Sequence, residues 1–173
     1  ETEFEGRAGA DLKMGIGPSL TLDATFNPDF GQVEADPAVV NLSAFPVFFD
    51  EKRPFFVEGK QLLEAGGLFY SRRIGAPPRG RPEADFVDMP RNTTILAAGK
   101  LTGRTPGGLS VGALGAVTSA ESAAIYDSAT NTFGEARVEP STAWAVLSAN
   151  QEFGVEGSTI GGSFTGVRRS LGT

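Results

Sequence analysis

The residues best suited to binding or acid–base chemistry lie in a segment rich in both aromatic and charged side chains. Residues 27–59 read NPDFGQVEADPAVVNLSAFPVFFDEKRPFFVEG, and a second charged run, LFYSRRIG, follows at residues 68–75. Guanidinium groups bind carboxylates and phosphates through paired hydrogen bonds, and aromatic rings offer apolar faces for stacking. The ligand-binding candidates are Glu51, Lys52, Arg53, Glu58, Tyr70, Arg72 and Arg73.

Three interpretations of these charges remain open. In the first, they form structural ion pairs that anchor a loop, because arginine guanidinium groups commonly pair with carboxylates where both are partly buried. In the second, they hold a sugar, an acid or a phosphate. Acid chemistry by a Glu51 and Glu58 pair, or nucleophilic attack by Ser71, is a third use, but the chain contains no histidine to serve as a general base.

A metal site is not predicted. Asn27, Asp29, Glu34 and Asp36 offer oxygen ligands of the kind that calcium prefers, but their spacing matches no EF-hand loop, and Asp36 before proline is also a turn signal. The glycine-rich stretch GRTPGG at residues 103–108 lacks the Lys-Ser/Thr ending of a phosphate loop and is interpreted as a hairpin turn. No cofactor is predicted.

The composition limits the classes of partner. The chain has 173 residues, a formal net charge of −6 and no cysteine, and its isoelectric point is near 4.7. Nucleic acid is not expected as a partner, because phosphate backbones are bound by clustered lysine and arginine. The absence of cysteine removes disulfide and thiolate chemistry but fits either a reducing or an oxidising compartment.

Three β-hairpins are predicted to position the charged segment. Residues 7–27, 91–121 and 141–170 alternate apolar with small or polar side chains and contain glycine-rich turns. The turns are expected at Gly17-Pro18, at Thr105 to Gly108 and at Gly154 to Gly157. In these strands Ile95 is placed on the same face as Leu101, and Trp144 and Val146 on an apolar face.

The intervening residues 28–90 have no sustained alternation. Short helices are predicted over residues 38–45 and 58–64, and the proline-rich residues 75–90 are predicted to be a loop. Residues 122–140 are predicted to be a polar loop, with a short pairing at AAIYD. A small core for the segment is expected from Phe45, Phe48, Phe49, Phe55, Phe56, Phe69 and Tyr70.

The side chains on the less apolar strand faces suit a membrane barrel, but on the residues alone they leave it level with a soluble fold. Exposed faces of soluble sheets are usually rich in lysine and glutamate, whereas these faces carry Thr, Ser, Gly and Ala. Small polar side chains suit a barrel lumen, with the apolar side chains facing lipid. A soluble β-sandwich or lipocalin-like barrel remains the alternative. Three hairpins are too few to close a membrane barrel, so the chain is expected to be part of a longer polypeptide.

Several long stretches resemble one bacterial family. Residues 11–59, beginning DLKMGIGPSLTLDATFN, together with LFYSRRIG, ILAAGKLTGRTPGGLSVGALGAVT and STIGGSFTGVRR, are similar to a family of uncharacterised bacterial proteins. In that family a carbohydrate-binding family-nine-like domain precedes a long outer-membrane β-barrel of unknown function. The resemblance implies a secreted precursor and a Gram-negative outer-membrane location, but no established reaction.

The sequence therefore predicts an all-β chain, residues 1–173, that forms part of an outer-membrane β-barrel of up-and-down antiparallel hairpins. Residues 28–90 are expected to fold into the lumen as a plug or over its mouth as a cap. The expected partners are the lipid bilayer and a small-molecule or glycan solute, and the expected role is solute passage or surface binding. A membrane-associated hydrolase with its site in the plug, and a soluble all-β binding protein, are the alternatives.

Overall fold

The computed structural model describes residues 8–28, 48–64 and 67–170, and every structural statement below concerns these residues. Antiparallel strands dominate, so the all-β prediction is confirmed. The strands are β1 (Ala10–Ile16), β2 (Leu20–Phe26), β3 (Phe86–Asp88), β4 (Ile95–Arg104), β5 (Leu109–Thr118), β6 (Glu121–Asp127), β7 (Thr132–Glu139), β8 (Ser141–Phe153) and β9 (Ser158–Ser170). The helical turns are α1 (Pro54–Val57), η1 (Lys60–Leu62) and η3 (Ser71–Arg73).

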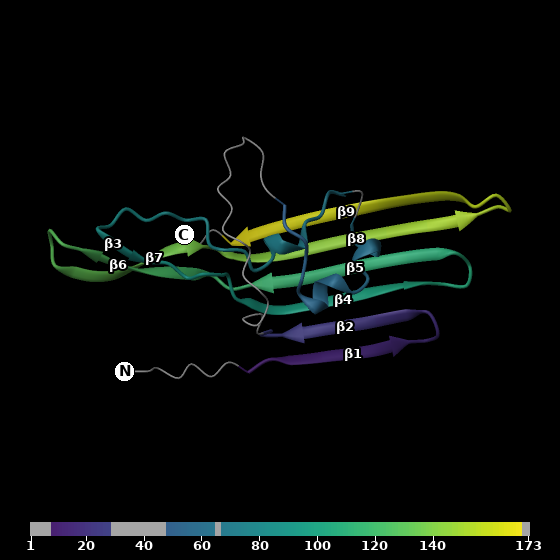
Figure 1. Cartoon of the computed structure of the whole chain (residues 1–173), viewed down its shortest axis with the longest axis horizontal. Coiled ribbons are helices and arrows are strands. Elements are labelled where there is room, and N and C mark those ends of the chain that lie inside the picture. The colour runs from purple at the N-terminus through teal and green to yellow at the C-terminus, as the bar shows by residue number, and fades with distance from the viewer. Residues whose placement is uncertain (1–7, 29–47, 65–66, 171–173) are drawn as a thin grey trace.

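The main sheet has six strands in the order β1-β2-β4-β5-β8-β9, and every neighbouring pair is antiparallel. Strands β1 and β2 pair within residues 7–27, β4 and β5 within residues 91–121, and β8 and β9 within residues 141–170. Their tight turns lie at one end of the sheet (Figure 1). Gly17, Gly108 and Gly154 have φ of 63°, 82° and 74°, which favours glycine at these turns. Within the described residues the sheet is open, with β1 and β9 as its edges.

A second sheet, in the order β3-β6-β7, extends beyond the opposite end of the main sheet (Figure 1). The sequence prediction was incomplete here, because residues 122–140 form a full β6–β7 hairpin rather than a loop with one short pairing. The predicted proline-rich loop was also wrong in part, since β3 lies inside it. Residues 83–89 contain no proline, so the three residues of β3 can pair with β6.

Two further differences concern the helices between β2 and β4. Instead of one helix over residues 58–64, the chain forms α1 and η1, because Gly59 between them has φ of 68° and interrupts the helical backbone. The helix predicted over residues 38–45 lies outside the described residues.

One face of the main sheet, here termed the outer face, is apolar across all six strands. Cross-strand partners share a face, and register defines four rows that cross the sheet from β1 to β9. All positions in these rows are apolar or glycine except Arg168. The rows are Ala10-Phe26-Ala97-Val117-Ala143-Arg168, Leu12-Ala24-Gly99-Gly115-Ala145-Gly166, Met14-Leu22-Leu101-Ala113-Leu147-Phe164 and Ile16-Leu20-Gly103-Val111-Ala149-Gly162.

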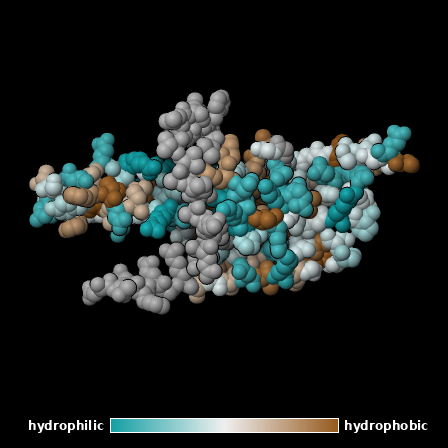
Figure 2. Space-filling view, viewed as in Figure 1, coloured by the Kyte–Doolittle hydropathy of each residue, from teal (hydrophilic) through white to brown (hydrophobic). Residues whose placement is uncertain are grey.

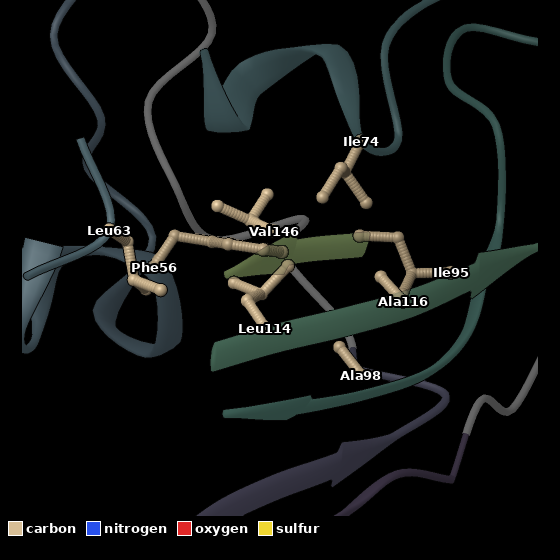
Figure 3. Packing of buried hydrophobic residues seen from close by; sticks show 8 residues of the cluster. All are labelled: Phe56, Leu63, Ile74, Ile95, Ala98, Leu114, Ala116 and Val146. Atoms are coloured by element: carbon tan, nitrogen blue, oxygen red, sulfur yellow. The ribbon is translucent and has the colours of Figure 1, made fainter. Parts of the chain in front are cut away.

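The opposite face is here termed the inner face, and the described residues 48–64 and 67–94 are here termed the insertion. Part of the insertion covers the middle of the inner face, whereas its residues Phe86–Asp88 belong to the second sheet and the edge strands β1 and β9 stay exposed. Figure 1 shows its short helices lying over β4, β5 and β8. A compact core joins it to the main sheet, whose residues are here termed the wall: Phe56, Leu63 and Ile74 from the insertion pack against wall residues (Figure 3). The wall members of this core are Ile95, Ala98, Leu114, Ala116 and Val146.

Two predicted side-chain placements on the apolar, lipid-facing side of the strands are wrong, because Ile95 and Val146 lie on the inner face. A register shift between Ile95 and Ala97 turns Ile95 into the core, away from the face of Leu101. Val146 is also buried against the insertion, with Trp144 packed beside it. The phenylalanine core was predicted in part: Phe56 is buried in the core and Phe55 and Phe69 pack against that core, whereas Phe48 is exposed. Phe45 lies outside the described residues.

Glycine allows the closest approach between insertion and wall. A Cβ placed on Gly112 of β5 would lie 2.2 Å from the carbonyl oxygen of Leu62, so no larger residue fits without displacing η1. In the described part of the chain, no helix combines the length and apolar character needed to span a bilayer.

Candidate functional site

Five of the seven candidate residues fall into two clusters on the insertion. Hydrogen bonds of Glu51, Arg53, Tyr70 and Arg72 connect residues 49–53 with residues 70–74. Glu58 instead lies where the insertion meets the wall. Lys52 and Arg73 are exposed. The sequence prediction thus identified the right segment but not this division.

Glu51 and Arg53 form the centre of the first cluster. The guanidinium Nε and Nη2 of Arg53 donate to Oε1 and Oε2 of Glu51 at 2.8 and 2.7 Å. The hydroxyl of Ser71 donates to Oε2 of Glu51 at 2.6 Å. Arg53 also donates to the carbonyl oxygens of Ile74 and Ser71, and its guanidinium carbon lies 4.2 Å from the ring centroid of Phe56. These contacts join the segments before α1 and around η3.

Tyr70 and Arg72 form hydrogen bonds with the backbone of Phe49 and Asp50. The Tyr70 hydroxyl accepts from the backbone N–H of Phe49 and donates to its carbonyl oxygen. Arg72 donates to the carbonyl oxygen of Asp50 at 2.6 Å. Both side chains therefore hold residues 48–50 against η3.

Burial and hydrogen bonding act in opposite directions on the pKa of Glu51. Burial favours the neutral acid and would raise the pKa, but the hydrogen bonds from Arg53 and Ser71 and the charge of Arg53 stabilise the carboxylate. The net result is a pKa below its ordinary value of 4.5. A carboxylate with a lowered pKa is a weak general base, so the Ser71–Glu51 pair supports a structural role better than nucleophilic catalysis.

The pKa of Glu51 predicts acid sensitivity of the insertion. Because the folded-state pKa is lower than the unfolded one, the stabilisation is present above about pH 4.5 and is lost as the pH falls through the folded value. Protease cleavage within residues 48–74 should accelerate below about pH 4.5 in the native chain. Glu51→Gln should cleave faster at neutral pH and lose most of this pH dependence, consistent with about 1.5–3 kcal/mol for hydrogen bonds to a charged group. Glu156→Gln, at an exposed turn, is the matched control; if its profile changes as much as that of Glu51→Gln, this assignment is wrong.

The second cluster centres on Lys100, whose side chain has no exposed surface. Its Nζ donates to the carbonyl oxygens of Phe55 and Glu58 at 2.6 and 2.7 Å and lies 3.5 Å from a carboxylate oxygen of Asp23. It also lies 4.9 Å from the ring centroid of Phe55. A wall residue on β4 therefore satisfies two carbonyl groups of the segment that contains α1, in addition to pairing with a wall carboxylate.

Lys13 extends this cluster to the edge strand. Its Nζ lies 2.5 Å from the Glu58 carboxylate and 3.9 Å from the Asp23 carboxylate. The hydrogen bond from Lys13 lowers the pKa of Glu58, and the charge of Lys13 acts in the same direction. Lys13, Asp23, Glu58 and Lys100 carry two positive and two negative charges; we term them the docking cluster.

Sequence reasoning missed three members of the docking cluster. Lys13, Asp23 and Lys100 are paired across β1, β2 and β4 in one inner row. Their signal in the sequence was the occurrence of opposite charges on strand faces that otherwise carry small side chains. Predicting their contact would have required the strand order β1-β2-β4.

A pocket with a volume of about 390 Å³ lies between the insertion and β5. Its lining is mainly aromatic and aliphatic, with carboxylates and one lysine. The lining residues are Phe48, Phe49, Asp50, Glu51, Phe56, Lys60, Leu63, Glu64, Gly67, Phe69, Tyr70, Ser71 and Leu114. Of the seven candidates, Glu51 and Tyr70 line this pocket, whereas Lys52, Arg53, Glu58, Arg72 and Arg73 do not.

The structure describes only one of the four side chains considered as oxygen ligands for a metal ion. Asp29, Glu34 and Asp36 lie outside the described residues, and the Asn27 amide nitrogen donates to the carbonyl oxygen of Ala8 at 2.8 Å. The described residues contain no group of three or more His, Cys, Asp or Glu side chains arranged to hold a metal ion.

Comparison with known proteins gives one match. No curated protein and no solved structure matches the chain significantly. A family model, described as a domain of unknown function (DUF5916), matches residues 1–170. Because this match covers nearly the whole sequence, the chain belongs to the DUF5916 family.

Proposed function

We propose that the main sheet forms part of the wall of a β-barrel in the bacterial outer membrane, with its outer face in lipid. In this proposal the insertion is a plug or cap on the lumen side, and the pocket beneath it binds a solute that passes through the barrel or is captured at its mouth. The observation that carries the proposal is the outer face: four apolar rows that cross six strands without being covered by any other described element.

The exposure of large apolar side chains on this face supports contact with lipid. Leu12, Leu147 and Phe164 are 53%, 52% and 59% exposed. Soluble monomers rarely expose contiguous apolar patches beyond a few hundred Å², because such patches drive association in water. A lipid-facing barrel wall requires this pattern.

The strand lengths also suit a membrane wall. Strands β4 and β5 have 10 residues each and β8 and β9 have 13 each, whereas β1 and β2 at one edge have 7 each. A tilted transmembrane strand needs about 9–11 residues. The open edges at β1 and β9 would pair with further strands, because backbone groups in hydrocarbon need partners.

The inner face supports a lumen assignment for the insertion. It carries Thr25, Thr102, Thr118 and Thr142, which are buried, together with the docking cluster. Small polar side chains and paired charges are typical of a partly polar barrel interior. This face also carries the core residues Leu114 and Val146, on which the insertion packs.

The pocket supports solute binding. Its volume lies within the range of about 300–1,000 Å³ that is typical of small-molecule sites, and its lining combines aromatic surface with a few polar groups. A small molecule with an apolar ring or chain fits this lining. The carbohydrate association implied by the resemblance is compatible with stacking on Phe48, Phe69 or Tyr70, all of which line the pocket.

Membrane insertion is testable with a polypeptide in which further strands pair with the open edges β1 and β9, because an unclosed sheet cannot satisfy its backbone groups in lipid. This polypeptide, denatured and diluted into dilauroylphosphatidylcholine vesicles, should float with the vesicles in a sucrose gradient and resist extraction with alkaline carbonate. Its electrophoretic migration should change on heating, as is expected for a folded membrane barrel. Failure to float, together with a monomeric and folded chain in buffer without detergent, would contradict the proposal and support a soluble binding protein.

A further inference from the structure

The second sheet carries an exposed aromatic row that the proposed function does not use. Register places Phe86, Tyr126 and Phe133 side by side on one face of β3, β6 and β7. The ring centroids of Phe86 and Tyr126 are 6.1 Å apart, and those of Tyr126 and Phe133 are 4.8 Å apart. Phe133 is 85% exposed and Phe86 is 69% exposed. Three adjacent rings therefore present apolar and π surface to solvent at the end of the molecule.

The next row on this face carries two carboxylates separated by a small residue. Register places Asp88, Ala124 and Glu135 across the same three strands. Neighbouring strands lie about 4.8 Å apart, so Asp88 and Glu135 are separated by about 10 Å, with Ala124 between them. Among the described residues, neither carboxylate has a hydrogen-bonded or ion-paired partner, and all three positions are exposed.

The nearest cation in register on this face is Arg137, and two further carboxylates lie at the turn end of the sheet, at positions that alternate with the aromatic row. Asp85 and Asp127 lie at the outer ends of β3 and β6, where they accept hydrogen bonds from Ser128 and from the turn backbone. Arg137 is two residues beyond Glu135 on β7. Figure 2 shows this end of the molecule as apolar atoms interspersed with hydrophilic ones. The negative charge and the aromatic row together favour a positively charged partner.

We propose that the face formed by β3, β6 and β7 docks an extended basic segment of a partner polypeptide, with lysine or arginine side chains over Ala124 between the two carboxylates. Alternate side chains of an extended chain lie about 6.8 Å apart on one side, which matches the spacing between the carboxylate row and the aromatic row. One cation then contacts Asp88 and Glu135 while the next stacks on the rings. The inference is independent of the proposed membrane function.

The test is fluorescence anisotropy with labelled ten-residue peptides and the full chain. The probe alternates lysine and alanine, and the controls alternate glutamine or glutamate with alanine. The lysine peptide should bind and the two control peptides should not. Binding should weaken as salt is raised from about 50 to 300 mM.

Variants decide which groups are responsible. Asp88→Asn combined with Glu135→Gln should weaken lysine-peptide binding by about five- to tenfold, and Phe133→Ala or Phe133→Leu by about threefold. Because Phe133 is exposed, both Phe133 variants should retain the native melting temperature to within a few degrees. Glu156→Gln, which removes an exposed acid from the β8–β9 turn, should bind like the native chain. Equal weakening by Glu156→Gln, or binding of the glutamine peptide with the same affinity, would overturn the proposal.

Discussion

Arginine in place of Phe164 should abolish most membrane insertion, whereas arginine in place of its neighbour Ser163 should have little effect. Both residues are exposed on β9, but Phe164 lies in an outer row and Ser163 in an inner one. Arginine facing lipid near the bilayer midplane costs about 2–4 kcal/mol, whereas a lumen position tolerates charge. Urea titration of the vesicle-bound barrel that contains the chain should show this loss of folding free energy for Phe164→Arg and less than about 0.5 kcal/mol for Ser163→Arg.

This pair separates the membrane proposal from the soluble alternative. In water, exposed positions usually tolerate substitution within about 0.5 kcal/mol, so a soluble protein should accept both arginines equally. Leu147→Arg provides an independent repeat on β8, because Leu147 is the cross-strand partner of Phe164. Equal stability of Phe164→Arg and Ser163→Arg in vesicles would refute lipid contact at the outer face.

Methionine in place of Lys100 should release the insertion from the wall. Methionine has a similar length but cannot donate to the carbonyl groups of Phe55 and Glu58, and it leaves the mostly buried Asp23 without its nearest wall cation. Removing one partner of a buried ion pair typically costs about 3–5 kcal/mol. Chymotrypsin should therefore cleave the insertion about 100-fold faster or more in Lys100→Met than in the native chain.

Two variants control this experiment. Lys60→Met removes a lysine that forms an exposed pair with Glu64 at 3.6 Å, and it should change the cleavage rate by less than about fivefold. Adding Asp23→Leu to Lys100→Met removes the uncompensated carboxylate and should recover part of the protection. Native-like protection in Lys100→Met would mean that the docking cluster does not hold the insertion.

The sequence was informative where side chains alternate and glycine marks the turns. Leu20, Leu22, Ala24 and Phe26 alternate with polar residues, and the structure has β2 there, on a hairpin that turns at Gly17. The pairing of β2 with β4 could not be predicted from the sequence. The residues between these strands show no alternation of apolar and polar side chains that would indicate where the chain rejoins the sheet. Ile95 shows the limit of alternation, since one bulge reverses the predicted face.

The candidate site was predictable in segment but not in geometry. Glu51 and Arg53 are close in sequence, so their pairing was an evident option. The hydroxyl of Ser71 and the carbonyl oxygen of Ile74, which complete the cluster, lie about twenty residues away and meet Glu51 and Arg53 through packing of Phe56 and Ile74 in the core. Lys100 was missed because its partners are mainly backbone carbonyl groups, which carry no sequence signal.

Lipid contact at the outer face is tested most directly by nitroxide accessibility at single cysteines. The chain has no native cysteine, so one spin label can be placed at each site without background. In vesicles, labels at Leu147→Cys and Phe164→Cys should collide with oxygen, which concentrates in hydrocarbon, and should be shielded from a water-soluble nickel chelate. A label at Ser163→Cys should show the lower ratio of oxygen to nickel collisions. Labels at positions 147 and 164 that collide freely with the nickel chelate, or with neither reagent, would contradict the account.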